Sequence, residues 1–448
     1  MSHQSQWTSR FGYIMTAAGF SIGLGNIWRF PYLTGTEGGG AFVIIYVLMA
    51  LLIGIPLFIM ETGLGRKTKL SPVEGMRKLN GRGNIWNSLA WLGVAAAFFI
   101  LTYYIQIMGW IVSYFIRMAG GLMKGQNYEE TKAAFDSFRG NWPALLIFTL
   151  ICMVIVAVIS AAGLEKGVEK TCKVIMPLLF IMLVMLAIRS LTMPNAFEGV
   201  KWYLTPDFSK VTGKTFLNAL GQIFFSIGIA SGGALVYGAY LDDKSDMITD
   251  CSLVVILDTG AAILAGLVIF PAIISMGLEP GSGPGLLFVS MSRIFSDMPF
   301  GQFFGAVFFL LVFFAALSSA LGYLEPVATT VRDNFKISRP AAVWSSLIAA
   351  ILVGLPAILS EGPLKNVRIL GMNLFDADDF FSGNVLMPLG AIVLIFYVIF
   401  KWKYEGLRDD VNKGARNIKV APYWKILIYG LIPIALVIIF VTGIISVF

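Results

Sequence analysis

The chain has 448 residues, of which 57% are hydrophobic and 13% are charged, and its net charge is +7. A soluble protein of this composition would lack enough polar residues to cover its surface, and many windows of about 20 residues, the length that crosses a bilayer, are nearly free of charge. The basic residues lie between apolar spans, so the positive charge does not indicate nucleic-acid binding. We expect an all-α polytopic membrane protein in a lipid bilayer, and we infer no nucleic-acid partner and no obligate protein partner.

Enzymes and ATP-driven pumps are excluded by what the sequence lacks. The only histidine is His3, and there is neither a His-Glu-x-x-His motif nor a phosphate loop. No histidine is therefore available to activate a serine or to relay protons. Cys152, Cys172 and Cys251 lie in or beside apolar segments, with no spacing that suggests a metal site or a disulfide framework. We expect a protein that moves a solute and catalyses no reaction.

Apolar segments predict eleven membrane spans. They are 10–34, 39–65, 86–117, 142–162, 168–189, 215–240, 248–275, 302–332, 341–359, 379–401 and 423–446. Lys and Arg concentrate in the loops 66–82 and 401–419, which by the positive-inside rule places the N-terminus in the cytoplasm and the C-terminus outside the cell. We therefore expect a multi-pass protein of the cell membrane.

Two spans carry interruptions at membrane depth. The first breaks around 21–25, inside a stretch that also contains Asn26, Arg29 and Pro31, and the sixth breaks around 226–233. Freed backbone at this depth must be buried in protein or line a cavity, where carbonyls can hold a cation and amides an anion. Glycine-rich helix packing is the alternative for each break taken singly. Two breaks at matched positions favour the binding site of a secondary transporter.

The spacing of the breaks predicts an internal repeat. They lie five spans apart, so we expect a first five-helix repeat over 1–190 and a second, inverted repeat over 191–402. Residues 403–448 would add a cytoplasmic loop and an eleventh helix. The Gly/Pro-rich stretch 279–285 is either a hinge for a cap over a vestibule or an ordinary turn.

The sequence Gly-Leu-Gly-Asn-Ile-Trp-Arg-Phe-Pro at 23–31 resembles the first-helix signature of the neurotransmitter:sodium symporters. The stretches 38–42, 54–56, Glu61 and 65–66 continue the similarity through the second helix. The stretches 103–104, 221–226, 315–319 and 379–383 are similar to the third, sixth, eighth and tenth helices. Within the family, the chain looks most similar to eleven-helix bacterial transporters of several hydrophobic amino acids. The resemblance implies a LeuT-like fold and sodium-driven transport by alternating access.

The resemblance also implies two sodium ions. The first would be held by the carbonyls of Ser21 and Ser226, the side chains of Asn26, Ser226 and Asp258, and the substrate carboxylate. The second would be held by the carbonyls of Gly19, Ile22 and Ala315 and the hydroxyls of Ser318 and Ser319. Without the resemblance, the two serines would indicate helix–helix hydrogen bonding.

Asp258 is the most informative of these residues. It lies in mid-membrane, where a carboxylate costs about 2.5–3.5 kcal/mol and calls for a cation. Chloride-dependent members of the family carry a neutral residue at this position. We therefore expect a chloride-independent transporter.

The resemblance places an amino acid in the central site. Its carboxylate would meet the amides of Leu24 and Gly25 and the hydroxyl of Tyr104, and its amine would meet carbonyls of Phe225 or Ser226. Its side chain would face Ile100, Phe225, Ser231 and Ala320. Ser231 stands where leucine-preferring members carry an aromatic residue, so we expect Trp, Phe and Tyr as well as Leu and Ile. The alternative is a proton-coupled or exchange-type amino-acid transporter of the same fold, which sodium-free uptake would reveal.

Gates are implied on both sides of this site. Arg29 and Asp379 would form the outer gate, over a lid made by Tyr104 and Phe225; snorkelling to the interface is the alternative for Arg29. Tyr240 and Asp333 match the inner gate. Gln4 stands where relatives carry a gating arginine, so either Arg10 substitutes for it or the inner gate is looser. Glu61 would accept hydrogen bonds from the broken sixth helix.

Gly167 and Pro177 match a family pattern in the fifth helix. The resemblance implies that the inner end of this helix unwinds and hydrates the second sodium site from the cytoplasm, because proline removes a backbone donor and glycine unwinds easily. A static proline kink is the alternative. On the unwinding interpretation, alanine at either position would slow sodium release.

Overall fold

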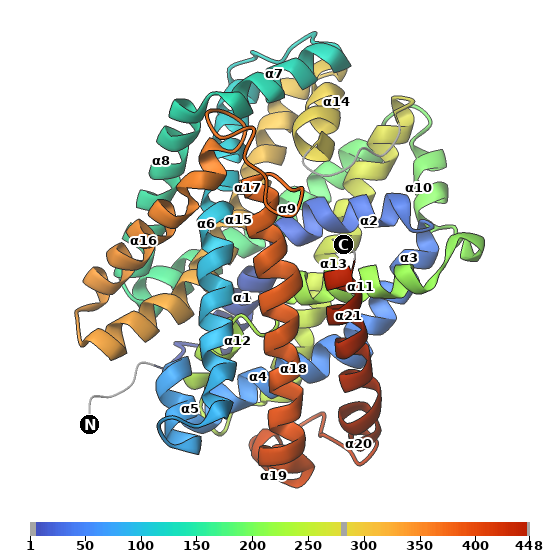
Figure 1. Ribbon diagram of the computed structural model, residues 1–448. Helices are drawn as coiled ribbons and strands as arrows, with labels where there is room; N and C mark the ends of the chain where they lie inside the picture. Colours follow the sequence, from blue (N-terminus) through green and yellow to red (C-terminus); the bar gives the residue numbers. More distant parts are fainter. Residues whose placement is uncertain (1–5, 279–284, 446–448) are drawn as a thin grey trace.

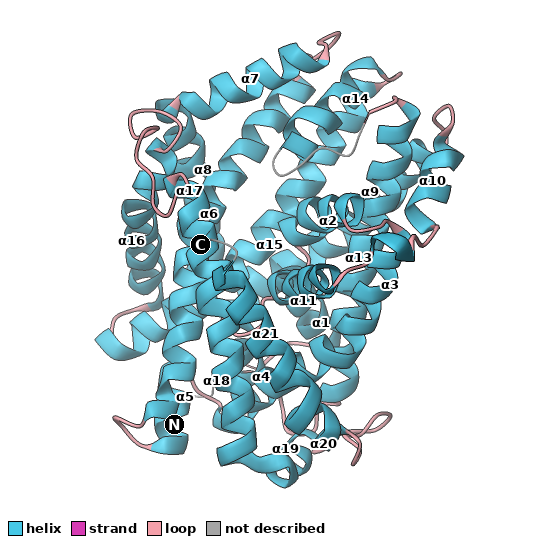
Figure 2. Ribbon diagram, turned by 45° about the vertical axis from the view of Figure 1, so that its right-hand side comes forward, coloured by secondary structure: helices cyan, strands magenta, loops and turns pink. Residues whose placement is uncertain are grey.

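The computed structural model describes residues 6–278 and 285–445, and these residues fold almost entirely into helices (Figures 1 and 2). Within these ranges the only β-type pairings are two isolated bridges, Gly39 with Pro206 and Ile369 with Met372. His3, Gln4, the Gly/Pro-rich stretch 279–284 and the last three residues lie outside the described residues. The all-α prediction is confirmed.

In the described part of the chain, nine helices are long and apolar enough to cross a membrane. They are Gly40–Thr68, Ile85–Ala119, Trp142–Ala161, Leu164–Leu191, Met247–Ser275, Gly301–Phe335, Arg339–Leu359, Leu374–Val411 and Trp424–Ile445. The other two predicted spans are the two interrupted segments, so all eleven predicted spans find a counterpart. The tenth differs most from its predicted bounds of 379–401, because helical hydrogen bonding continues through polar residues at both ends.

The helices have the following bounds. The uninterrupted spans contain α3 (Gly40–Met49), α4 (Ile55–Thr68), α6 (Ser88–Ala119), α8 (Trp142–Ala161), α9 (Lys170–Leu191), α13 (Met247–Ser275), α15 (Gly301–Phe335), α16 (Arg339–Leu359), α17 (Leu374–Phe380), α18 (Met387–Tyr397), α19 (Lys403–Val411), α20 (Trp424–Ile426) and α21 (Ile432–Ile445). The connecting helices are α5 (Pro72–Asn80), α7 (Tyr128–Gly140), α10 (Ala196–Leu204) and α14 (Ser292–Asp297). Figure 1 shows α5, α19 and α20 at one end of the molecule and α7, α10 and α14 at the other.

Both predicted breaks are present. The helix α1 (Arg10–Ser21) ends at Ile22, whose backbone is extended, and the chain resumes with a π-helical turn (Gly25–Arg29) and α2 (Phe30–Thr36). In the sixth span, α11 (Gly213–Ile227) and α12 (Gly233–Ala239) flank residues with left-handed backbone: Gly228 at φ 63°, Ala230 at φ 61° and Gly232 at φ 80°. A right-handed helix cannot continue through such residues.

Glu61 of α4 holds the break in the sixth span. This side chain is buried, and its carboxylate accepts hydrogen bonds from the amides of Ala230 at 2.8 Å and Gly232 at 3.0 Å. These amides have no helical partner at the break, and an unpaired backbone group is costly at membrane depth. The contact is the one expected for Glu61 from the sequence. The division of the chain into two inverted repeats stays a prediction.

Candidate functional site

A buried carboxylate lies between the two broken spans. Asp258 of α13 is 1% exposed and accepts hydrogen bonds from Asn26 at 2.8 Å, from Ser226 at 3.0 Å to each of its oxygens, and from Tyr46 at 3.4 Å. Asn26 also donates to the Asp258 carbonyl at 2.9 Å, and its own side-chain oxygen accepts from the amide of Gly23 at 2.9 Å. Three of the residues predicted for the first sodium site thus meet at one point.

The donor set around Asp258 is neutral in the described residues. An amide, a serine hydroxyl and a tyrosine hydroxyl surround the carboxylate, and none of them offsets its charge. Hard oxygen ligands with one formal negative charge are what a small hard cation prefers. The arrangement fits a sodium ion. Ser21 is the last residue of α1, directly before the break in the first span. Its hydroxyl donates to the carbonyl of Ala17 at 3.1 Å.

A second group of oxygens lies where α1 meets α15. The hydroxyl of Ser319 is 3.3 Å from the carbonyl oxygen of Gly19 and 3.4 Å from that of Ile22. The hydroxyl of Ser318 donates to the carbonyl of Ala315 at 3.0 Å. The five residues predicted for the second sodium site are therefore neighbours. Gly19 has to be small here, because a Cβ atom at this position would lie 3.0 Å from the Cβ of Ser318.

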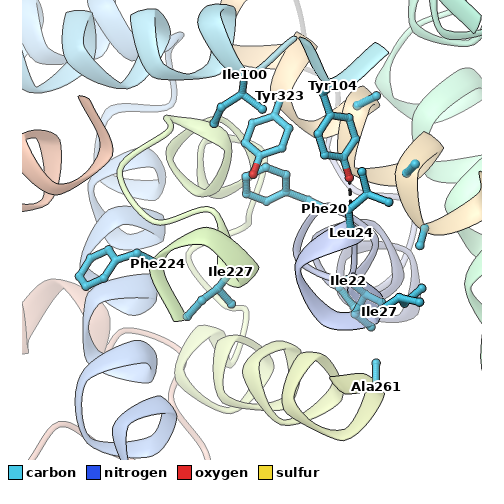
Figure 3. Packing of buried hydrophobic residues seen from close by; sticks show 14 of the residues in the cluster. Phe20, Ile22, Leu24, Ile27, Ile100, Tyr104, Phe224, Ile227, Ala261 and Tyr323 are labelled. Carbon is cyan, nitrogen blue, oxygen red and sulfur yellow. Dashed lines mark hydrogen bonds between the residues drawn. The ribbon is translucent and has the colours of Figure 1, made fainter. Parts of the chain in front are cut away.

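The amides expected to meet a substrate carboxylate lie at the first break. The amide of Leu24 donates to the hydroxyl oxygen of Tyr104 at 3.4 Å (Figure 3), so these two groups converge on one point. A Cβ on Gly23 would lie 2.5 Å from the Ser319 hydroxyl oxygen and 2.9 Å from the Tyr104 hydroxyl oxygen. A Cβ on Gly25 would lie 3.0 Å from the ring of Phe225. The backbone is thus close to both polar and aromatic groups.

Three residues expected around the substrate side chain come from α6, α15 and the break in the sixth span. Ile100 and Ala320 are fully buried, and Ser231 donates to the carbonyl of Gly228 at 2.6 Å within the sixth-span break. A Cβ on Gly93 would lie 3.3 Å from the backbone of Ser231, which places the break against α6 two helical turns before Ile100.

Phe20 is a residue that sequence reasoning missed. A Cβ atom on Gly228, Gly233 or Gly322 would lie 2.4, 2.5 or 2.2 Å, respectively, from the nearest atom of this ring. The ring also makes an edge contact with Tyr323 at 5.2 Å between centroids, and Tyr323 in turn contacts Tyr104 at 5.9 Å. Figure 3 shows Phe20 next to Tyr323, with Ile100 and Tyr104 on either side of Tyr323 in this view. No local sequence pattern links three glycines from separate segments to one ring.

The outer gate residues line a cavity of about 270 Å³ above the first break. It is bounded by Leu24, Trp28, Arg29, Tyr32, Tyr103, Tyr104, Ile107, Phe225, Phe375, Asp376, Asp379, Gly383 and Asn384. The Arg29 guanidinium lies 5.1 Å from the ring centroid of Phe225. Arg29 and Asp379 face this cavity without forming a direct ion pair, so the structure leaves room between them for water or a solute group.

The two residues expected at the inner gate, Tyr240 and Asp333, contact different neighbours. Tyr240 lies on a cavity of about 490 Å³ and contacts the ring of Trp7 at 6.3 Å between centroids. Asp333 pairs with its neighbour Arg332 at 2.8 Å. Arg10 pairs with Asp250 of α13 at 2.6 Å and not with Asp333. The described residues therefore join the start of α1 to the seventh span at this end.

Gly167 and Pro177 lie in the fifth span as predicted. Pro177 is inside α9, and Gly167 belongs to a π-helical turn (Leu164–Glu169). The Glu169 carboxylate in this turn accepts from the amide of Thr8 at 3.2 Å and pairs with Lys173 at 2.6 Å, which fixes the start of the first span to the fifth. The turn is wound in this structure.

Two further polar contacts were missed for different reasons. Gln222 of α11 donates to the carbonyl of Gly25 at 2.8 Å and is fully buried. A single amide side chain in an apolar helix is a recognisable sign of such a bond. Tyr46 lies in an uninterrupted apolar run, where nothing in the sequence distinguishes it from a packing residue.

Comparison with known proteins gives the same family as the motifs. The family model for the sodium:neurotransmitter symporter family matches residues 4–126 and 139–448. The chain is 37% identical over 451 aligned residues to an uncharacterized sodium-dependent transporter of Bacillus subtilis, YhdH, with 100% of each chain covered. It is 34% identical to an uncharacterized sodium-dependent transporter of Haemophilus influenzae, which covers 98% of this chain and 97% of that one.

A solved structure has the same fold. The crystal structure of MhsT in complex with L-phenylalanine matches with a TM-score of 0.90 and 36% sequence identity, over 98% of this chain and 99% of that one. The chain belongs to the sodium:neurotransmitter symporter family. It is a sodium-dependent membrane transporter of a small molecule and not an enzyme.

Proposed function

We propose that the protein is a sodium-coupled symporter that imports hydrophobic and aromatic L-amino acids, namely Trp, Phe, Tyr, Leu and Ile, by alternating access and without a need for chloride. The observation that carries this proposal is the Asp258 carboxylate, which is 1% exposed and surrounded by neutral donors between two helix breaks. Removing one charge from water without a partner is expensive at this depth. A sodium ion beside Asp258 supplies the missing charge.

Two sodium ions account for the two groups of oxygens. The first ion is coordinated by Ser21, Asn26, Ser226 and Asp258 together with the substrate carboxylate, so ion and solute bind cooperatively. The second is coordinated by Gly19, Ile22, Ala315, Ser318 and Ser319, and it joins α1 to α15. These assignments are supported by the short distances from Ser319 to the carbonyls of Gly19 and Ile22.

The substrate class follows from the lining of the site. Leu24, Gly25 and Tyr104 bind the carboxylate, and Phe225, Ser226, Ile100, Ser231 and Ala320 surround the rest of the molecule. Burial of Ile100 and Ala320 supports an apolar side chain. MhsT, whose crystal structure was solved in complex with L-phenylalanine, has the same fold over 98% of this chain.

Transport proceeds by exposing this site to each side in turn. Arg29 and Asp379 close the outer cavity, Tyr240 and Asp333 act at the cytoplasmic side, and the turn around Gly167 unwinds, with Pro177, to release sodium. The protein lies in the cell membrane with its N-terminus in the cytoplasm and its C-terminus outside. The basic side chains of Lys67 and Lys413 at the end that carries α19 support this orientation.

Uptake into proteoliposomes tests the proposal. Purified protein is reconstituted, and uptake of labelled tryptophan, leucine and alanine is followed while sodium and chloride are replaced independently by choline and gluconate. We expect sodium-dependent uptake of tryptophan and leucine that exceeds uptake of alanine and does not change when chloride is removed. Uptake that persists without sodium would instead support the proton-coupled or exchange-type alternative.

A further inference from the structure

A polar stripe runs along the outer half of the broken sixth span. Thr215, Asn218 and Gln222 follow one another at spacings of three and four residues on α11, so they share one face of the helix. All three side chains bond to the outer half of the first span. Thr215 donates to the Glu37 carboxylate at 2.9 Å, Asn218 donates to its other oxygen at 2.6 Å, and Gln222 donates to the carbonyl of Gly25 at 2.8 Å.

Glu37 occupies an unusual position for an acidic residue. It caps the C-terminal end of α2, where the helix dipole disfavours negative charge. The same carboxylate meets the first turn of α11, at the end where the dipole favours negative charge, beside a capping box formed by Thr212 and Thr215. The favourable electrostatic interaction of the Glu37 carboxylate is therefore the one with α11. This side chain joins the C-terminal end of α2 to the N-terminal end of α11.

α11 also borders a cavity of about 330 Å³ beside α21 and the tenth span. Its lining includes Leu217, Asn218, Gly221, Asn384 and Thr442. Arg29 lines this cavity as well as the outer vestibule. The inner end of α11 is bonded through Ser226 to Asp258 of α13. The outer part of α11 is bonded to the first span through Thr215, Asn218 and Gln222, so this is the part that can move with α2.

We propose that Glu37 is a positioning residue of the transport cycle, which fastens α11 to α2 so that the outer halves of both broken spans open and close the vestibule together. Phe225 and Ser226 lie about ten residues beyond the Glu37 contact, or about 15 Å along the helix. Two contacts fix the distance of Phe225 and Ser226 from Leu24 and Gly25. Gln222 bonds to Gly25 near the break, and Glu37 bonds to the first turns of α11. The inference applies to whichever solute the protein carries.

Closure of the vestibule tests this proposal. A cysteine is introduced at Ile107, which lines the outer cavity, and its rate of labelling by a membrane-impermeant thiol reagent is measured with sodium alone and with sodium plus a transported solute. The native Cys152, Cys172 and Cys251 are buried, and the chain without the new cysteine gives the background. The variants are Glu37→Ala, Asn218→Ala and the double variant. The control is Thr36→Ala, because the Thr36 hydroxyl bonds only within α2 in the described residues.

We expect solute to slow labelling strongly in the parent protein and about tenfold less in Glu37→Ala, since α11 without the two hydrogen bonds to the carboxylate no longer follows α2 when the vestibule closes. The KM for uptake should rise more than the maximal rate falls. The double variant should resemble Glu37→Ala, because both substitutions remove the same contact. Protection equal to that of the parent, the same loss in Thr36→Ala, or additive effects in the double variant would each overturn the proposal. If Glu37→Ala does not assemble, Asn218→Ala and Glu37→Gln give the same comparison from an intact protein.

Discussion

Asp258 combines a formal negative charge with donors that carry none. Asn26, Ser226 and Tyr46 hold its two oxygens in place, and each comes from a different span. Fixed orientation matters here, because a carboxylate that is already held loses little freedom when a cation arrives. Under the proposed function, the same residue would bind the ion and replace an external anion.

Asp258→Asn removes this charge while keeping the shape of the side chain. We expect sodium-driven uptake to be lost, or to reappear only when chloride is supplied, since chloride would then bring back the negative charge. Uptake is measured in proteoliposomes with chloride or gluconate on both sides, and the unmodified protein in the same buffers is the control. Full uptake by the variant in gluconate would contradict the role given to Asp258.

Phe20→Leu should enlarge the space beside the substrate side chain. The ring fills the volume next to Gly228, Gly233 and Gly322 and contacts Tyr323, so a smaller side chain leaves room below Ile100. We expect the preference for tryptophan over leucine to rise by about tenfold, which is the scale of discrimination that a few carbon atoms provide. Competition of unlabelled tryptophan and leucine against labelled leucine measures this ratio.

A matched control is Phe58→Leu, which alters a fully buried ring in α4. It should change stability without changing the ratio of the two amino acids. An unchanged ratio in Phe20→Leu would mean that the ring serves packing alone.

Several candidate site residues stand out in the sequence because they are polar where the chain is otherwise apolar, and the family resemblance assigned them to ion sites. Asn26, Ser226, Asp258 and the paired serines at 318–319 are such residues, and the structure brings them together in two groups. Phe20 could not be found this way, since an aromatic residue in an apolar helix has no distinguishing pattern. Its environment depends on how α1, α12 and α15 pack against one another.

At the scale of elements, the two breaks were predictable, and the family resemblance also implied the support that Glu61 gives to the second of them. Glycines and polar residues at membrane depth indicate where a helix ends, and both interruptions occur near 21–25 and 226–233. The helix α19, which follows the tenth span after a break at Lys403 with φ 60°, was not predicted, because hydropathy falls at 401. Hydropathy reports contact with lipid and does not report helical hydrogen bonding.

The fifth span requires a revision of one expectation. A Cβ on Gly167 would lie 1.9 Å from the carbonyl oxygen of Ile159, so alanine does not fit the wound turn. The sequence suggested that Gly167→Ala would slow sodium release by stiffening the helix. The structure predicts the opposite, because the clash destabilises the wound form by about 1–3 kcal/mol.

Gly167→Ala should therefore favour the unwound form and speed release. Hydrogen exchange of the amides in 164–170 should become faster, and sodium should bind more weakly. Gly430→Ala is a suitable control, since a Cβ at that helical glycine meets no atom within 4 Å. Slower exchange in Gly167→Ala would restore the original expectation.

At the scale of the whole molecule, the proposed stoichiometry of two sodium ions has an electrical consequence. Two sodium ions carried with a zwitterion move two charges, which corresponds to about 4.6 kcal/mol per 100 mV of membrane potential. We expect an inside-negative potassium diffusion potential, set with valinomycin, to raise the accumulation of amino acid more than a thousandfold per 100 mV at equilibrium. Accumulation that rises only about fiftyfold would indicate one ion per cycle.

The ring of Phe20 and the three glycines around it also constrain how this protein can change over evolution. The four positions lie in three spans and share one fixed volume, so bulk can be added at one of them only if it is removed at another. Relatives with a small residue at position 20 should therefore carry larger side chains at 233 or 322, since the left-handed backbone of Gly228, at φ 63°, disfavours a side chain there. A variant library built on positions 20, 233 and 322 together should yield functional exchanges that no single substitution allows. Positions in three different spans would then vary as one group.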